Sequence, residues 1–309
     1  MIVSASRRTD IPACYSKWFL NRLREGFVYV RNPVNFHMVR RVGLDRDVVD
    51  GIVFWTKNPL PMMDVLDDVE GYCRDYYFQF TVTPYGKDVE PGIPSKADVI
   101  IPAFQALSDR IGRERVVWRY DPILLSEKYT PEYHARAFEA IAGRLHGYTN
   151  KCTISFIDFY QGAAGGFKAL GISPLDEPMM RVMAKTLSEI AHSYGLEMDA
   201  CAEAIDLGEY GIGGARCVDG RIFERMTGHG LDVKKDGNQR PECGCDASVD
   251  IGMYNTCGNG CRYCYANHSE KSVLANVGRH DAGSPLLCGE IGKDDVVKER
   301  VMRSCKILV

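Results

Sequence analysis

Three cysteines near the C-terminal end constrain this chain more than any other feature. Cys257, Cys261 and Cys264 have the spacing C-x3-C-x2-C, and Gly258 and Gly260 lie between the first two. Glycine adopts positive φ without steric cost, so the backbone can turn tightly between these thiols. Three thiolates from so short a loop can converge on one inorganic centre. Because iron–sulfur clusters usually take four cysteines, a three-cysteine loop predicts an iron with an open position.

The composition is that of an ordinary globular protein. The 309 residues are 45% hydrophobic and 26% charged, which fits one large α/β barrel or two domains. The formal charge of −3 gives no overall field for nucleic acid, which is therefore a disfavoured partner. No apolar run has the length of a membrane span, and charges stand where a signal peptide needs its apolar centre. We expect no membrane partner and a cytoplasmic protein.

The twelve cysteines are unevenly placed. The cytosol keeps the thiols of its proteins reduced, so a disulfide framework is not expected. Cys243 and Cys245, together with Cys201 and Cys217, could form a second, closed zinc or iron–sulfur centre. The alternative is that Cys201 and Cys217 are core thiols and that the other two bind the metal of the first group. The remaining five are expected to be buried and inert: Cys14, Cys73, Cys152, Cys288 and Cys305.

Apolar strand-like runs alternate with helical patterns through the first two hundred residues. This alternation predicts βα units and a parallel sheet, and we expect a TIM-barrel-like α/β fold over residues 1–205. The expected strands are residues 2–5, 27–30, 51–55, 77–82, 115–120, 153–157 and 196–200. Expected helices include one ending at Gly26, one over 131–145 and one over 179–194. Residues 206–309 are predicted to be an irregular, cysteine-rich iron–sulfur-binding region that caps the barrel mouth.

Polar residues follow almost every expected strand. Parallel barrels place their sites at the carboxyl ends of strands, so these residues are predicted to line one mouth. They include Arg7, Arg8, Asp10, Arg31, Lys57, Arg119, Asp121, Ser155, Asp158 and Glu203. The alternative for any one of them is a turn or a helix cap, and the aspartates could simply neutralise the cations.

The triplet spacing, with an aromatic residue at Tyr263, resembles the cluster loop of radical S-adenosylmethionine (SAM) enzymes. In that superfamily the loop follows the first strand, whereas here it lies past residue 255. That inversion, with residues 6–12 (SRRTDIP), 54–59 (FWTKNP) and 248–252 (SVDIG), resembles a bacterial family, domain of unknown function 1848, over essentially the whole chain. The family resemblance implies no substrate.

The radical SAM resemblance implies a [4Fe–4S] cluster on the triplet, SAM chelated at the open iron, and an external flavodoxin- or ferredoxin-like electron donor. It implies that Tyr263 packs near the adenine of SAM. Glu203 and Ser155 become candidate partners of the SAM amino group or ribose. Basic residues at the strand ends become candidates for holding the SAM carboxylate or an anionic small-molecule substrate, with Asp121 beside them. These basic residues are Arg7, Arg8, Lys57 and Arg119.

Two other functions remain open from the residues. In the first, the clustered cysteines bind zinc and organise a binding protein, whose basic strand ends dock phosphate or nucleic acid. In the second, the cysteine region is structural and the barrel is an enzyme whose base is Asp121, Asp158 or Glu203.

Overall fold

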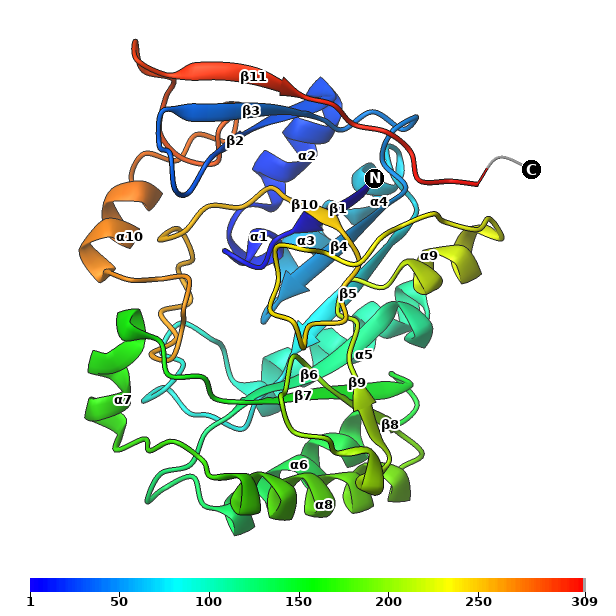
Figure 1. Cartoon of the computed structure of the whole chain (residues 1–309), viewed down its shortest axis with the longest axis vertical. Helices are drawn as coiled ribbons and strands as arrows, with labels where there is room; N and C mark the ends of the chain where they lie inside the picture. The colour runs from blue at the N-terminus through cyan, green and yellow to red at the C-terminus, as the bar shows by residue number, and fades with distance from the viewer. Residues whose placement is uncertain (308–309) are drawn as a thin grey trace.

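An eight-stranded parallel sheet forms the centre of the structure, which is a computed structural model and describes residues 1–307 (Figure 1). Its strands run in the order β10-β1-β4-β5-β6-β7-β8-β9, and every neighbouring pair is parallel. The bounds are β1 Ile2–Ala5, β4 Gly51–Thr56, β5 Tyr76–Thr81, β6 Val116–Ile123, β7 Lys151–Phe156, β8 Glu197–Ala200, β9 Ile212–Gly214 and β10 Ser248–Asp250. The predicted α/β class is confirmed. Among residues 1–307 no pairing joins β9 to β10, so the strand order is barrel-like but closure is not established.

Helices alternate with these strands. Figure 1 shows α5, α6 and α8 packed together along one side of the sheet. The α-helices are α1 Ile11–Cys14, α2 Ser16–Glu25, α3 Leu60–Met63, α4 Leu66–Glu70, α5 Ile101–Ile111, α6 Pro131–Leu145, α7 Ala164–Leu170, α8 Glu177–Ser193, α9 Gly220–Thr227 and α10 Glu270–Val277. Shorter turns are the π-helix η1 Lys96–Ile100 and the 3-10 helices η2 Arg113–Arg115, η3 Gln161–Ala163 and η4 Gly208–Tyr210. No helix within residues 1–307 is both long and apolar enough to cross a membrane.

Local sequence explains where the predicted helices begin and end. Helix α6 begins with Pro131, and the Thr130 side chain accepts a hydrogen bond from the Tyr133 amide at 3.2 Å. Helix α2 ends at Gly26, whose φ of +74° is left-handed and suits glycine. These signals act within one helical turn, which is why they can be recognised before the fold is known.

Alternation along the strands separates two cores. Val3 and Phe78 face the helices, whereas Ile2 and Tyr77, their immediate neighbours, face the opposite side of the sheet. That opposite side is covered by residues 215–245, which contribute buried apolar side chains. The segment that crosses from β9 to β10 therefore lies against the strands and lines the site built on them.

A second, three-stranded sheet corrects one expectation. The run at 27–30 does form a strand, β2 Phe27–Arg31, but it pairs antiparallel with β3 Met38–Gly43, and β3 pairs with β11 Val296–Arg300. Only residues 32–37 separate β2 from β3, and a parallel crossover needs a dozen or more residues. Arg31 therefore lies outside the mouth of the main sheet.

Residues 206–309 also contain regular elements. β9 and β10 are the two edges of the main sheet, and β11 belongs to the small sheet. The expected boundary at residue 205 falls between β8 and β9, two paired strands. Figure 1 shows the yellow and orange segments of this region against strands and helices of the first half.

Candidate functional site

A cavity of about 500 Å³ lies at the carboxyl ends of the parallel strands. Its lining includes residues that follow β1, β4, β7 and β8, residues near the end of β6, and both groups of cysteines. The strand-end residues are Arg7, Arg8, Asp10, Lys57, Arg119, Asp121, Ser155, Asp158 and Cys201. Carboxyl ends of parallel strands are the usual place for sites in this architecture, and the volume suits a small molecule. Most of the strand-end residues expected at one mouth therefore line this cavity, whereas Arg31 and Glu203 are not among its lining residues.

The triplet, meaning Cys257, Cys261 and Cys264, lines this cavity. Its loop is tied to the segment after β1, because Asn259 Nδ2 donates to Asp10 Oδ2 at 3.0 Å and the Tyr15 hydroxyl donates to the Thr256 carbonyl at 2.5 Å. The triplet therefore lies at the opening beside the first strand, although it comes from the end of the chain.

Backbone hydrogen bonds hold the other side of the triplet loop against residues 83–95. The Gly92 amide donates to the Asn259 carbonyl at 3.0 Å, and the Arg262 amide donates to the Val89 carbonyl at 3.0 Å. A Cβ at Gly92 would lie 2.6 Å from the Asn259 oxygen, so this approach requires glycine.

Cys14 departs from the expectation that it is buried and isolated. It is exposed at the end of α1, and its thiol lies beside that of Cys257, whose pKa it raises. Of the other thiols predicted to be inert, Cys152 and Cys288 are buried, whereas Cys73 and Cys305 are half-buried. The spacing of 243 residues between Cys14 and Cys257 gave no signal of this contact.

Glu90 is a fully buried carboxylate beside the triplet, and sequence reasoning missed it. It accepts hydrogen bonds from Lys57 Nζ at 2.8 Å, Lys96 Nζ at 2.6 Å, Thr83 Oγ1 at 2.9 Å and the Tyr263 hydroxyl. Burial by itself raises the pKa of Glu90, but the two lysines lower it to about 2. Lys57 is thus part of an ion-paired network, and Tyr263, which lines the cavity, is held by its hydroxyl.

The buried Arg119 and the half-buried Asp121 form a second pair. Arg119 Nε lies 3.0 Å from Asp121 Oδ2, and its Nη1 donates to Gln79 Oε1 at 3.3 Å and to Cys217 Sγ at 2.8 Å. The Ser155 hydroxyl donates to the other oxygen of Asp121. Burial raises the pKa of Asp121, but Arg119 outweighs it and holds that pKa below its ordinary value. Arg119 Nη2 also donates to Asp121 Oδ2, so all three guanidinium nitrogens have partners, as expected of a charge-neutralising pair.

Arg7 and Arg8 are held differently. The Arg7 guanidinium lies 5.3 Å from the Trp55 ring centroid and near Cys245, which raises the pKa of Arg7, yet within residues 1–307 its buried Nη2 has no hydrogen-bond partner. Arg8 Nη1 donates to the Gly252 carbonyl at 3.4 Å, and Arg8 Nε lies 3.9 Å from Asp250. Arg7 is therefore a cation beside the cavity with a donor to spare.

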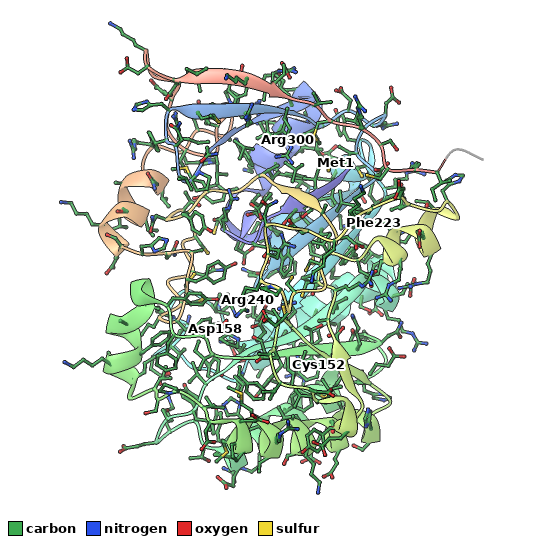
Figure 2. All side chains as sticks on the ribbon, viewed as in Figure 1. Met1, Cys152, Asp158, Phe223, Arg240 and Arg300 are labelled. Carbon is green, nitrogen blue, oxygen red and sulfur yellow. The ribbon has the colours of Figure 1, made fainter. Side chains whose placement is uncertain are left out.

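Glu203 lies behind the cavity wall. Its Oε1 accepts a hydrogen bond from the Phe156 amide at 2.8 Å, and desolvation raises its pKa to about 7. Asp158, in contrast, pairs with Arg240 at 2.7 Å, and Figure 2 shows these two labelled residues side by side.

The quartet, meaning Cys201, Cys217, Cys243 and Cys245, lines the same cavity. Cys201 and Cys217 have their sulfurs 3.3 Å apart, and Cys245 lies beside both Cys217 and Cys243, which lower the pKa of Cys245. Across residues 1–307, however, no three Cys, His, Asp or Glu side chains are arranged so that they could hold a metal ion. The quartet is a chain of pairwise contacts rather than four sulfurs around one point.

Arg31 lies at a second cavity of about 530 Å³, next to α10 and the small sheet. It forms a two-pronged ion pair with Asp295, with both distances 2.8 Å. This cavity shares Arg8 with the thiol-lined one, but its lining includes Cys288 and none of the triplet or quartet.

The fold and the cavity define an α/β protein whose site lies at the carboxyl ends of parallel strands and is lined by two groups of thiols. The chain belongs to the family described as a domain of unknown function (DUF1848), which matches residues 2–266. The matched range includes the eight strands of the main sheet and both groups of thiols, and it ends before α10 and β11. Comparisons with curated proteins and with solved structures gave no match.

Proposed function

We propose that this protein is a radical SAM-type iron–sulfur enzyme in which the triplet holds a [4Fe–4S] cluster. One observation carries the proposal: the three thiols of the C-x3-C-x2-C loop line a small-molecule-sized cavity together with polar residues from five strand ends. A structural metal site needs no such cavity. A cluster that acts on a bound molecule does.

The donor set fits the group. Three soft thiolates are the usual ligands of iron–sulfur clusters, and three from one loop leave a position free for another ligand. The loop is fixed by side-chain hydrogen bonds to the segment after β1 and by backbone hydrogen bonds to the segment after β5, so the thiols are held at the cavity wall. When bound, the cluster would supply the electron that cleaves SAM and starts radical chemistry.

The residues around the cavity would bind and orient. Tyr263 would present its ring to the adenine while Glu90 holds its hydroxyl. Arg7, with its free Nη2, is better suited to a carboxylate of SAM or substrate than Arg119, whose guanidinium already has three partners. Asp121 would orient Ser155 toward the cavity. In this proposal Lys57, Arg119 and Asp121 maintain the charge balance of the wall.

The same pairing disfavours a basic docking surface for phosphate or nucleic acid. Lys57, Arg119 and Arg240 each have a carboxylate partner within 3.0 Å. Cations already neutralised in this way have little left to offer a phosphate backbone.

The test is release of 5′-deoxyadenosine. Protein purified without oxygen and reduced with dithionite is incubated with SAM, and the product is measured by chromatography. We expect wild type and Cys152→Ala, a buried thiol outside the cavity, to release it. The triple variant Cys257→Ala, Cys261→Ala, Cys264→Ala should release none and contain no iron on the triplet. Equal release by the triple variant and wild type would contradict the proposal.

A further inference from the structure

The quartet is assembled from three distant segments. Cys201 follows β8, Cys217 follows β9, and Cys243 and Cys245 precede β10, at the far edge of the sheet. The last two segments are joined by a backbone hydrogen bond from the Asp246 amide to the Val218 carbonyl at 2.9 Å. Four thiols from the two edges of one sheet therefore meet on the cavity wall.

The backbone that carries Cys217 is anchored independently of its sulfur. Its carbonyl accepts hydrogen bonds from the Tyr77 hydroxyl at 2.7 Å and from Gln79 Nε2 at 2.9 Å. The Tyr77 hydroxyl in turn accepts from the Asp219 amide at 2.9 Å. β5 thus fixes the middle of the quartet before any ligand binds.

The sulfurs face positive charge. Arg119 Nη1 donates to Cys217 Sγ at 2.8 Å, the Arg7 guanidinium lies near Cys245, and the Val218 amide donates to Cys245 Sγ at 3.4 Å. The two guanidinium groups lie 5.2 and 5.3 Å from the same Trp55 ring. Buried cations are costly without anions, and neutral thiols are weak acceptors. Four thiolates around one divalent ion carry a net charge of −2, which would be offset chiefly by Arg7, because Arg119 is already paired with Asp121.

We propose that Cys201, Cys217, Cys243 and Cys245 bind one zinc ion, forming a second metal centre separate from the triplet. Zinc–sulfur bonds of about 2.3 Å in a tetrahedron place neighbouring sulfurs about 3.8 Å apart. The 3.3 Å between Cys201 and Cys217 is close to this spacing. A [4Fe–4S] cluster binds each cysteine to a different iron, which keeps the sulfurs farther apart.

In this structure the four sulfurs of the quartet are not arranged around one point where a metal ion could bind. Zinc binding would draw Cys201 and Cys243, the two ends of the contact chain, toward the Cys217 and Cys245 pair. Cys201 is half-buried, so its rotation displaces little packed structure. A closed four-thiolate site leaves no position for substrate, so this centre would fasten residues 215–245 onto the sheet and hold Arg7 and Arg119 beside Trp55.

This proposal does not depend on the triplet's cluster, and metal analysis separates the two. Zinc and iron are measured per chain in protein expressed with both metals and purified without oxygen. Wild type should contain about one zinc, the triple triplet variant should keep it, and Cys217→Ala and Cys245→Ala should retain less than about a tenth. The buried control Cys152→Ala should keep its zinc.

A spectroscopic measurement covers the case in which the quartet variants do not fold. The triple triplet variant, free of the triplet's iron, is loaded with cobalt(II) in place of zinc. A tetrahedral four-thiolate spectrum supports the centre. The proposal is overturned by wild type without zinc, by zinc retained in folded Cys217→Ala, by iron lost from the quartet variants in place of zinc, or by a Cys201–Cys217 disulfide found in peptides of the purified protein.

Discussion

The triplet and the quartet line the same cavity but are built in opposite ways. The triplet lies within eight consecutive residues, and its loop is held by backbone hydrogen bonds to neighbouring loops. The quartet spans residues 201–245, and its sulfurs contact one another and two guanidinium groups. The thiols of the triplet come from one short loop, whereas those of the quartet are gathered from several segments and contact one another. The first arrangement suits a reactive centre with an open position and the second a closed structural one.

The largest effect on stability is expected from Glu90→Gln, a substitution next to the triplet and not next to the quartet. It leaves Lys57 and Lys96 buried without their common carboxylate, so we expect about 3 kcal/mol lower unfolding free energy in urea titrations. The exposed pair Arg181–Glu177 provides the control, and Glu177→Gln should change stability by less than about 0.5 kcal/mol. An equal loss of unfolding free energy in the two variants would show that the buried Glu90 network stabilises the fold no more than an exposed ion pair.

The same network predicts a pH dependence. The pKa of Glu90 falls from its ordinary 4.5 to about 2 on folding, so the unfolded chain binds the proton more readily. Its contribution is therefore fully present above about pH 4.5 and is lost as pH falls toward 2. Unfolding free energies measured across this range should fall less steeply for Glu90→Gln than for wild type. Parallel curves would contradict the assignment.

Arg7 and Arg119, both in contact with the quartet, should differ in SAM binding. Arg7 has a free donor, so Arg7→Gln should raise the KM for SAM by about tenfold, the value of one charge-assisted hydrogen bond. Arg119→Lys keeps the charge but loses the planar fork shared by Asp121, Gln79 and Cys217, so it should lower stability and leave that KM unchanged. The reverse pattern of KM values would assign the SAM carboxylate to Arg119.

A smaller effect is expected where α7 touches the triplet loop. A Cβ at Gly166 would lie 2.1 Å from the Arg262 carbonyl oxygen, whereas a Cβ at Gly165 meets nothing within 4 Å. Gly166→Ala should cost about 1–3 kcal/mol and speed iron release to a chelator, without changing zinc content. Gly165→Ala should be neutral or slightly stabilising. Identical iron release by the two variants would mean that the loop moves aside freely.

The smallest effect is expected at Cys14, whose side chain contacts Cys257. If the triplet leaves one iron open, Cys14→Ala should keep full iron content and release 5′-deoxyadenosine at the wild-type rate. Loss of iron in this variant would make Cys14 a fourth ligand and the site a closed one.

Much of the parallel sheet and its site could be predicted from local patterns. Six of the seven expected strands lie in the main sheet, because alternation of apolar runs with capped helices is a short-range signal. The run at 27–30 was misplaced because periodicity identifies a strand but not its partner, and the short connection to β3 enforces an antiparallel pair. The triplet was visible because its residues are neighbours in the chain.

The remaining parts of the site depend on contacts that no local pattern encodes. Glu90 is one acidic residue among 41 Asp and Glu until folding places it between two lysines and Tyr263. The contact of Cys14 with Cys257 joins the end of α1 to the triplet loop, and that of Cys201 with Cys217 joins the segments that follow the paired strands β8 and β9. Spacing along the chain therefore determined which thiols could act together in one loop. Strand order and the path from β9 to β10 decided which cations, carboxylates and distant thiols surround those thiols. The physical reason is that a buried charge is costly unless the tertiary structure places an opposite charge next to it.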